Sequence, residues 1–165
     1  MTAQAAAVFL ILGLTVGMTN STPPAVSSGG ARSDASTPPV LINTCLITKD
    51  VSGLAAFYAQ VLQIEPHKAS ESYVEFRTSA GVLALFAADA QESYIPGAAT
   101  PGQNRSSILE FRVGNVDEEY ARLHNLVKTW VKGPTTQPWG TRSIYFRDPA
   151  GNSLEFATAD IWDIS

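Results

Sequence analysis

The sequence predicts an α+β fold in which one unit, a strand followed by a helix and three more strands, occurs twice. Two stretches carry apolar residues at helical spacing, and short segments rich in β-branched and aromatic residues surround each of them. The two patterns repeat with a period of about 65 residues, which indicates an internal duplication. The chain has 165 residues, enough for one globular domain, which we place at residues 40–165 with units at about 41–88 and 107–158.

The first unit is predicted from an alternation of strand and helix patterns. Residues 41–48 predict a strand that contains Cys45, and Asp50 is a candidate helix N-cap. As the only cysteine, Cys45 excludes an internal disulfide, and we expect an inert, buried thiol. Residues 73–78 and 82–88 predict two strands, and residues 89–105 a connector. A helix is expected between the strand at 41–48 and the strand at 73–78. Its single apolar stripe consists of Leu54, Phe57, Tyr58, Val61 and Leu62.

The second unit repeats this order. Residues 108–113 predict a strand, and Asn115 with Glu118 forms the start of a helix in the manner of a capping box. A short strand at about 129–131 precedes the final hairpin. The apolar stripe of the second helix consists of Val116, Tyr120, Leu123 and Val127.

The final hairpin holds the most informative residues of the chain. Asp148-Pro149-Ala150-Gly151-Asn152 is a turn sequence, because proline presets φ, glycine accepts a positive φ, and Asp and Asn bond to nearby backbone. In the strand after it, Leu154 and Phe156 point to one face and Glu155 to the other. A carboxylate in such a place needs a metal ion, a hydrogen-bonding partner or water.

The N-terminal region differs in composition from the rest of the chain. Residues 5–18 form an uncharged apolar run, too short to span a bilayer stably, so residues 1–18 are a candidate signal peptide. Residues 19–39, rich in Ser, Thr, Pro and Gly, predict a disordered linker. We therefore favour export to the periplasm or medium. A mistaken start site or an unstructured tail of a cytoplasmic protein is the alternative.

Charge excludes one class of partner. The formal net charge is −4, and the sequence has no run of basic residues. Nucleic acid is therefore not an expected partner.

The tandem strand–helix–three-strand units, together with the sequence from Gln137 to Phe156, resemble the glyoxalase/bleomycin resistance protein/dioxygenase superfamily, also called the vicinal oxygen chelate superfamily. The segment from Asn43 to Val51 resembles the family's first strand and the start of its first helix. The resemblance covers about residues 41–158. It implies tandem βαβββ modules that form a curved mixed sheet, a half-barrel, around a central cavity with helices outside. It also implies a small-molecule ligand and a homodimer.

The same resemblance implies where metal-using members place their ligands. The corresponding residues are Asn43, Ala84 or Leu85 depending on register, Ile108 and Glu155, of which only Glu155 is a good ligand. A catalytic divalent ion needs about three protein ligands. We therefore expect no cofactor, with a divalent metal as the alternative. His67 and His124 are expected to face solvent or to bond locally.

Several side chains are candidates for a ligand pocket. If Leu109 and its neighbours pack under the helix, Ile108, Glu110 and Arg112 face the concave side of the sheet. In the alternative interpretation, Arg112 pairs with Glu110 or Glu155 and the cavity is filled. Trp130 and Trp139 then cap the core, and Arg142 is an exposed strand residue. The full candidate set is Asn43, Ile108, Glu110, Arg112, Trp130, Trp139, Arg142 and Tyr145, with Glu155 as the candidate catalytic residue.

Two functions from different classes follow. The first is a small-molecule-binding protein without a complete metal site, similar to the drug-sequestering members of the family. The alternative is a metal-dependent lyase, isomerase or dioxygenase that uses Glu155, with a metal completed by water and a partner chain, or with Glu155 as general base. A scaffold domain without a ligand is a third interpretation.

Overall fold

The computed structural model describes residues 39–158. The predicted leader at 1–18 and almost all of the predicted linker at 19–39 lie outside the described residues. The chain divides into residues 1–41 and 42–165, and the fold described below belongs to the second of these units.

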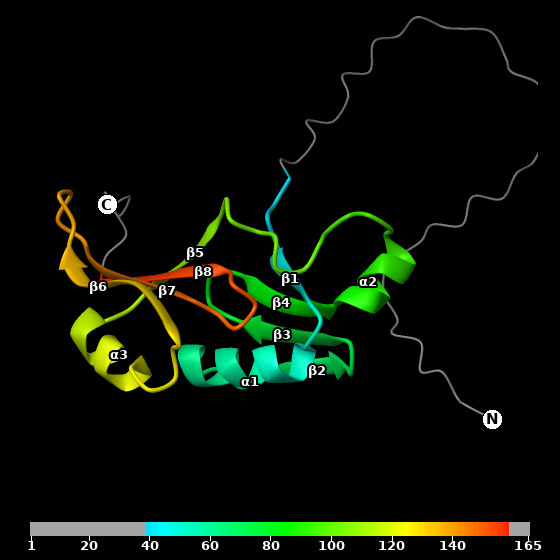
Figure 1. The fold of residues 1–165 in the computed structure, drawn as a ribbon, viewed down its shortest axis with the longest axis horizontal. Coiled ribbons are helices and arrows are strands. Elements are labelled where there is room, and N and C mark those ends of the chain that lie inside the picture. The colour runs from blue at the N-terminus through cyan, green and yellow to red at the C-terminus, as the bar shows by residue number, and fades with distance from the viewer. Residues whose placement is uncertain (1–38, 159–165) are drawn as a thin grey trace, which may run out of the picture. The chain divides into compact units, whose positions relative to one another are not determined.

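The described residues contain two βαβββ modules in tandem, which confirms the predicted α+β fold (Figure 1). The first module comprises β1 (Asn43–Thr48), α1 (Val51–Leu62), β2 (His67–Ser70), β3 (Tyr73–Arg77) and β4 (Val82–Ala87). A helix, α2 (Ala88–Tyr94), connects it to the second module. That module comprises β5 (Ile108–Arg112), α3 (Val116–Leu123), β6 (Thr129–Thr136), β7 (Arg142–Arg147) and β8 (Ser153–Ala157).

Each module builds its own four-stranded mixed sheet with the same strand order. The orders are β1-β4-β3-β2 and β5-β8-β7-β6, and in each the first and last strands of the module pair in parallel. Helix α1 packs on β3 and β4, and α3 packs on β6 and β7. Four features differ from the prediction. No strand was placed at 67–70, where β2 lies, and α3 ends at Leu123, so Val127 of the predicted stripe follows the helix. The connector at 89–105 begins within a helix, and the strand expected at 129–131 continues to Thr136.

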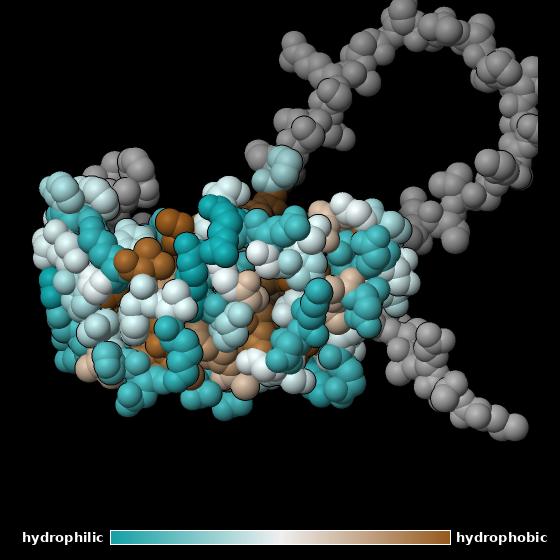
Figure 2. Space-filling model, in the orientation of Figure 1, coloured by the Kyte–Doolittle hydropathy of each residue, from teal (hydrophilic) through white to brown (hydrophobic). Residues whose placement is uncertain are grey.

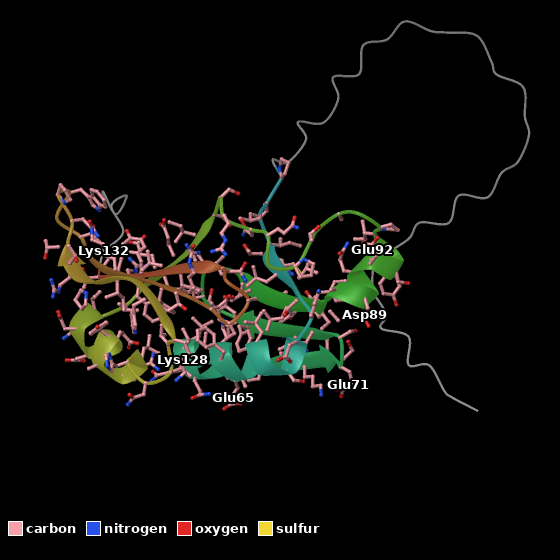
Figure 3. All side chains as sticks on the ribbon, in the orientation of Figure 1. Glu65, Glu71, Asp89, Glu92, Lys128 and Lys132 are labelled. Carbon is pink, nitrogen blue, oxygen red and sulfur yellow. The ribbon has the colours of Figure 1, made fainter. Side chains whose placement is uncertain are left out.

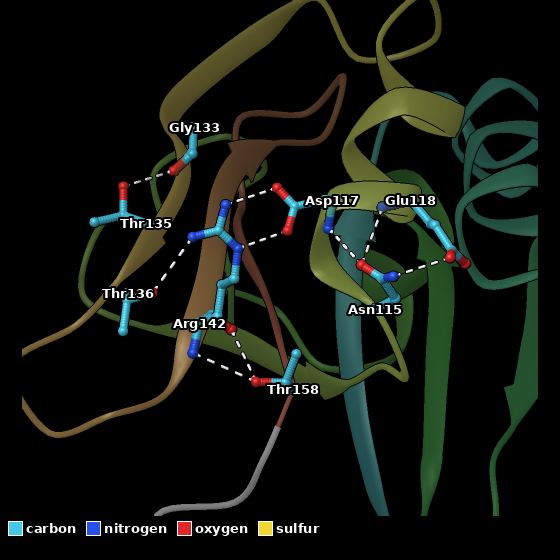
Figure 4. Close-up of polar contacts among 8 residues, drawn as sticks. All are labelled: Asn115, Asp117, Glu118, Gly133, Thr135, Thr136, Arg142 and Thr158. Carbon is cyan, nitrogen blue, oxygen red and sulfur yellow. Dashed lines mark hydrogen bonds and ion pairs between the residues drawn. The ribbon is translucent and has the colours of Figure 1, made fainter.

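Both long helices begin at the predicted caps. The Asp50 side chain accepts a hydrogen bond from the Gly53 N–H at 2.8 Å. At the start of α3, Asn115 Oδ1 accepts from the N–H groups of Asp117 and Glu118 at 3.0 and 3.3 Å (Figure 4). Asn115 Nδ2 in turn donates to Glu118 Oε1 at 2.9 Å, so the capping box is confirmed.

One hydrophobic core joins the two modules. The apolar stripes of α1 and α3 supply buried residues to it, as predicted, and both sheets contribute their helix-facing side chains. The largest fully buried apolar side chains come from both modules: Tyr58, Phe76, Phe146, Leu85, Leu123, Ile144 and Leu154.

The predicted turn in the last hairpin connects the modules. The Tyr58 hydroxyl on α1 donates to Asp148 Oδ2 at 2.8 Å, across 90 residues of sequence. The same carboxyl group accepts from the backbone N–H and the side-chain amide of Asn152, each at 2.8 Å, and Gly151 has φ +88°. Burial, and then the neighbouring Asp148, raise the pKa of Tyr58 well above its usual value. Asp148 therefore stabilises its own turn and anchors it to the first module.

Arginine 122 makes a second connection between the modules. Its guanidinium donates to the carbonyl oxygens of Gln60 and Val61 at 2.7 and 2.8 Å. These carbonyls lie in the last turn of α1, where they lack partners within the helix. Helix α3 thus caps the end of α1.

The expectation of a buried thiol at Cys45 is wrong. Cys45 is exposed on the edge strand β1, opposite Ala84. Its neighbour Leu46 takes the position in the core instead.

Polar side chains cover much of the molecular face shown in Figure 2, with smaller apolar areas between them. Large apolar side chains at the surface include Ile108, Val131 and Trp139. None of the helices within residues 39–158 has the length and apolar character needed to cross a membrane.

The Tyr58–Asp148 bond leads to a stability prediction. Tyr58→Phe removes the hydroxyl from a buried carboxyl group and should lower the free energy of unfolding by about 1.5–3 kcal/mol. Urea denaturation followed by circular dichroism measures the change. Tyr94→Phe, at a tyrosine that is 62% exposed, is the matched control and should leave the midpoint in place. An unchanged midpoint in Tyr58→Phe would refute the proposed connection.

Candidate functional site

Glu155 lies on the face of the second sheet that points away from the core, here called the open face. Leu154 and Phe156, its neighbours on β8, are buried in the core. Glu155 is opposite Glu110 on β5 and opposite Tyr145 on β7. Residues opposite one another in a sheet share a face, so these three side chains form a row across the open face.

The partner of the Glu155 carboxyl group is a tyrosine. Glu155 is only 8% exposed, and its Oε1 accepts a hydrogen bond from the Tyr145 hydroxyl at 2.7 Å. Burial raises the pKa of Tyr145, and the hydrogen bond to Glu155 and the nearby Glu110 raise it further. Tyr145 therefore remains a protonated donor at neutral pH.

A second set of polar side chains continues from this row. Ser143, two residues before Tyr145 on β7, is fully buried and accepts a hydrogen bond from Gln137 Nε2 at 2.9 Å. Lys132, which is labelled in Figure 3, lies on β6, and its Nζ donates to Gln137 Oε1 at 3.1 Å. Sequence reasoning missed these three residues. For Ser143 a signal was available: side chains two residues apart on a strand share a face, so Ser143 lies on the same face as Tyr145.

The corresponding face of the first sheet, which also points away from the core, is more apolar than the open face of the second. Asn43 Nδ2 donates to the Tyr73 hydroxyl at 3.0 Å, while Asn43 Oδ1 is buried without a hydrogen-bond partner among the described residues. Tyr73 packs edge-on against Phe86, with ring centroids 5.7 Å apart. Ala84 pairs with Cys45, whereas Leu85 lies in the core. The register alternative is thus resolved in favour of Ala84.

The residues at the family's ligand positions do not fit a three-ligand metal ion. Ala84 and Ile108 have no donor atom, Asn43 offers a neutral amide, and Glu155 already accepts from Tyr145. Within residues 39–158, no group of three or more His, Cys, Asp or Glu side chains is arranged to hold a metal. His67 lies exposed on β2, and the His124 ring packs edge-on against Tyr120 at the end of α3.

The other candidate pocket residues are spread over the molecule. Ile108 and Arg112 are exposed on β5, and Trp139 is 60% exposed in the turn before β7. Trp130 lies on the core side, where its ring packs against Tyr120 and Phe146 at 4.6 and 5.5 Å. Only Glu110, Tyr145 and Glu155 of the candidate set form one row.

Arg142 has a structural partner. Its Nε and one terminal nitrogen bind the two carboxylate oxygens of Asp117, each at 2.6 Å (Figure 4). The hydrogen bond from Arg142 is the main reason that the pKa of Asp117 falls below its usual value. The guanidinium is thereby held at the start of α3.

The tandem βαβββ modules, with a buried glutamate on the open face of the last strand, define a glyoxalase-like α+β protein. The sequence profile of the Glyoxalase/Bleomycin resistance protein/Dioxygenase superfamily matches residues 41–156. The chain belongs to this superfamily, as the resemblance in its sequence indicated.

Solved structures with this fold are numerous. A lactoylglutathione lyase from Agrobacterium tumefaciens has 28% identity and a TM-score of 0.57, over 77% of this chain and 98% of its own. A glyoxalase/bleomycin resistance protein/dioxygenase from Nocardioides has 24% identity and a TM-score of 0.62, over 73% and 83%. A glyoxalase-related enzyme from Fulvimarina pelagi has 21% identity and a TM-score of 0.63, over 72% and 86%. No curated protein matches the sequence.

The hydrogen bond between Tyr145 and Glu155 leads to a prediction for the pKa of Tyr145. In Glu155→Gln the pKa of Tyr145 should fall, because a neighbouring negative charge no longer opposes formation of tyrosinate. It should stay above the ordinary value, because burial is the largest cause of the shift. Ultraviolet difference titration measures this change, with Tyr145→Phe identifying the contribution of this tyrosine.

Glu110→Gln is the matched control for that titration. Glu110 raises the pKa of Tyr145 less than Glu155 does, so its removal should lower that pKa less. Equal titration curves for the wild type and Glu155→Gln would contradict the pairing.

Proposed function

We propose that this protein binds a small, mostly apolar or aromatic molecule on the open face of its second sheet, without a metal ion. The observation that carries the proposal is the buried Glu155 carboxyl group, held by Tyr145 at the last-strand position. The other metal-ligand positions of the family hold Asn43, Ala84 and Ile108, which favours binding by hydrogen bonds and apolar contact.

Glu155 can fix the orientation of a ligand. The structure gives its carboxyl group one hydrogen-bond donor, Tyr145, on Oε1. The second oxygen can accept from an N–H or O–H group of a ligand. Since Glu110 lies beside Glu155 on the neighbouring strand, a ligand with a donor or a positive charge is favoured over an anion.

The alternative function is an enzyme of the vicinal oxygen chelate type: a lyase, isomerase or dioxygenase. Its support is the 28% identity to a protein described as a lactoylglutathione lyase. A metal would then need ligands from a partner chain or from residues outside 39–158. Without a metal, Glu155 would act as general base and take a proton from a carbon acid within hydrogen-bond reach.

We also propose that the protein is exported and that it forms a homodimer. The apolar run at residues 5–18 supports export, which would let a binding protein meet its ligands outside the cytoplasm. Members of the superfamily often form dimers. Cell fractionation of the full chain, with recovery only in the cytoplasm, would refute export. A monomer at micromolar concentration by analytical ultracentrifugation would refute the dimer.

Metal analysis of the full chain tests the choice between the two functions. We expect metal at background level, as purified and after dialysis against Zn²⁺, Ni²⁺, Mn²⁺ and Fe²⁺, because three of the four ligand positions lack a strong donor. A stoichiometric metal that Glu155→Ala loses would overturn the proposal and favour the enzyme.

The role of Glu155 is tested by a thermal-shift screen of aromatic and cationic compounds. Any compound that raises the Tm of the wild type should raise it less with Glu155→Gln, because a hydrogen bond to a carboxylate becomes one to a neutral amide. A loss of about threefold to thirtyfold in affinity is expected. Lys68→Gln, at an exposed residue on β2, is the control. Turnover of a compound that collapses in Glu155→Gln would instead show catalysis.

A further inference from the structure

We propose that the ligand of the open face is a zwitterion: a small molecule with a cationic group at one end, an anionic group at the other and an apolar body between them. This inference rests on the function proposed above and names the class of its ligand. Two groups of opposite charge in one row across the second sheet carry it. Glu155 on β8 is opposite Tyr145 on β7, and Tyr145 is opposite Lys132 on β6. Residues opposite one another share a face, so Glu155 and Lys132 lie on either side of Tyr145.

Neither of these two charges has a counter-ion among residues 39–158. The Glu155 carboxyl group accepts one hydrogen bond, from the neutral Tyr145 hydroxyl at 2.7 Å. The Lys132 ammonium group donates one, to the neutral amide oxygen of Gln137 at 3.1 Å. Neighbouring strands lie about 4.8 Å apart, so β7 separates the strands of Glu155 and Lys132 by about 10 Å. A ligand can therefore neutralise both groups where they do not neutralise each other.

Both charged groups can be reached from solvent. Lys132 is exposed, and an ammonium group has three N–H donors, of which Gln137 uses one. Glu155 is 8% exposed, and Tyr145 bonds to its Oε1. The other oxygen, Oε2, has no partner among the described residues, yet it is not one of their buried atoms without a partner, so it is open to solvent. One end of a ligand can donate to this oxygen while the other accepts from Lys132.

The protein restrains the ammonium group through Gln137. A lysine can only donate, so the amide oxygen of Gln137 faces Lys132 and its nitrogen faces Ser143, to which it donates at 2.9 Å. Gln137 is 6% exposed and Ser143 is fully buried, so this amide has little freedom to turn. Tyr145 restrains Glu155 through its own hydrogen bond. Both charged groups are thus positioned before a ligand binds, which lowers the entropic cost of binding.

The surface beside the two charges suits an apolar body on the ligand. The Tyr145 side chain lies between them and is partly exposed. Ile108, which is 47% exposed, lies on the same face, two residues before Glu110. An aromatic ring would cover this surface and remove it from water. It would also hold the two charged groups of the ligand far enough apart to reach both Glu155 and Lys132.

The probe is para-aminomethylbenzoate, which carries an ammonium and a carboxylate group on opposite sides of a benzene ring. The comparison ligands are para-methylbenzylamine, in which a methyl group replaces the carboxylate, and para-methylbenzoate, in which a methyl group replaces the aminomethyl group. Isothermal titration calorimetry on the full chain should give the highest affinity for the zwitterion and the lowest for para-methylbenzoate. The reason is that Glu155 attracts a cation and repels an anion.

Variants assign the two ends of the ligand. Lys132→Gln should weaken binding of para-aminomethylbenzoate by about threefold to tenfold, because it removes a charge-assisted hydrogen bond at an exposed site. The same variant should bind para-methylbenzylamine as the wild type does. Glu155→Gln should weaken binding of both amines. Lys68→Gln removes an exposed positive charge on β2 and is the matched control, with no change for either ligand. Circular dichroism checks that each variant is folded.

The outcomes separate this inference from the function proposed above. Equal affinities of the wild type for the two amines, or an unchanged affinity of Lys132→Gln for the zwitterion, would refute the zwitterion. The binding function would still stand if Glu155→Gln weakened binding of para-methylbenzylamine. Affinities for both amines that do not change in Glu155→Gln would refute the proposed site and the inference together, as would no heat of binding with any of the three ligands. Equal loss in Lys68→Gln would refute the inference, because the effect would then come from overall charge.

Discussion

The fold depends on one buried carboxyl group, that of Asp148. It accepts hydrogen bonds from both nitrogens of Asn152 and from the Tyr58 hydroxyl on the helix of the other module. An oxygen buried in this way is costly unless its bonds are made, so the turn, α1 and β8 are restrained together. The Asp-Pro-x-Gly-Asn sequence therefore matters beyond its own turn, because it determines how the second module meets the first.

The same restraint positions the candidate site. Glu155 follows the turn by three residues, and the alternation of β8 turns it away from Leu154 and Phe156. Because those two side chains are locked in the core, Glu155 must point to the open face. Tyr145 reaches it from β7, the strand that enters the same turn. The packing of Leu154 and Phe156 in the core therefore also determines where the Glu155 carboxyl group points.

The sequence predicted what depends on periodicity and on local turn chemistry. The two modules, the helix caps and the buried faces of α1 and α3 all follow from short-range patterns, and the structure contains them. Cys45 was misplaced because an apolar strand does not reveal that it lies at an edge. The partner of Glu155, and the bonds from Lys132 through Gln137 to Ser143, depend on which strands are neighbours and on a register that no local pattern contains. Trp130 lies on the core side because of its pairing with Phe146, which also becomes visible only in the sheet.

The duplication allows the candidate site to be compared between the two modules. In the second module, the central position of the last strand holds Glu155, between Glu110 and Tyr145. In the first module, the corresponding position holds Ala84, between Cys45 and Glu75. A metal site shared by two modules needs donors from both, and of the family's four ligand positions only Glu155 carries a carboxylate. A single buried carboxylate with a tyrosine donor is, however, sufficient to orient a small ligand, because orientation needs one strong polar contact and a shaped apolar surface. The absence of donors from the ligand positions of the first module therefore agrees with the metal-free binding that we propose.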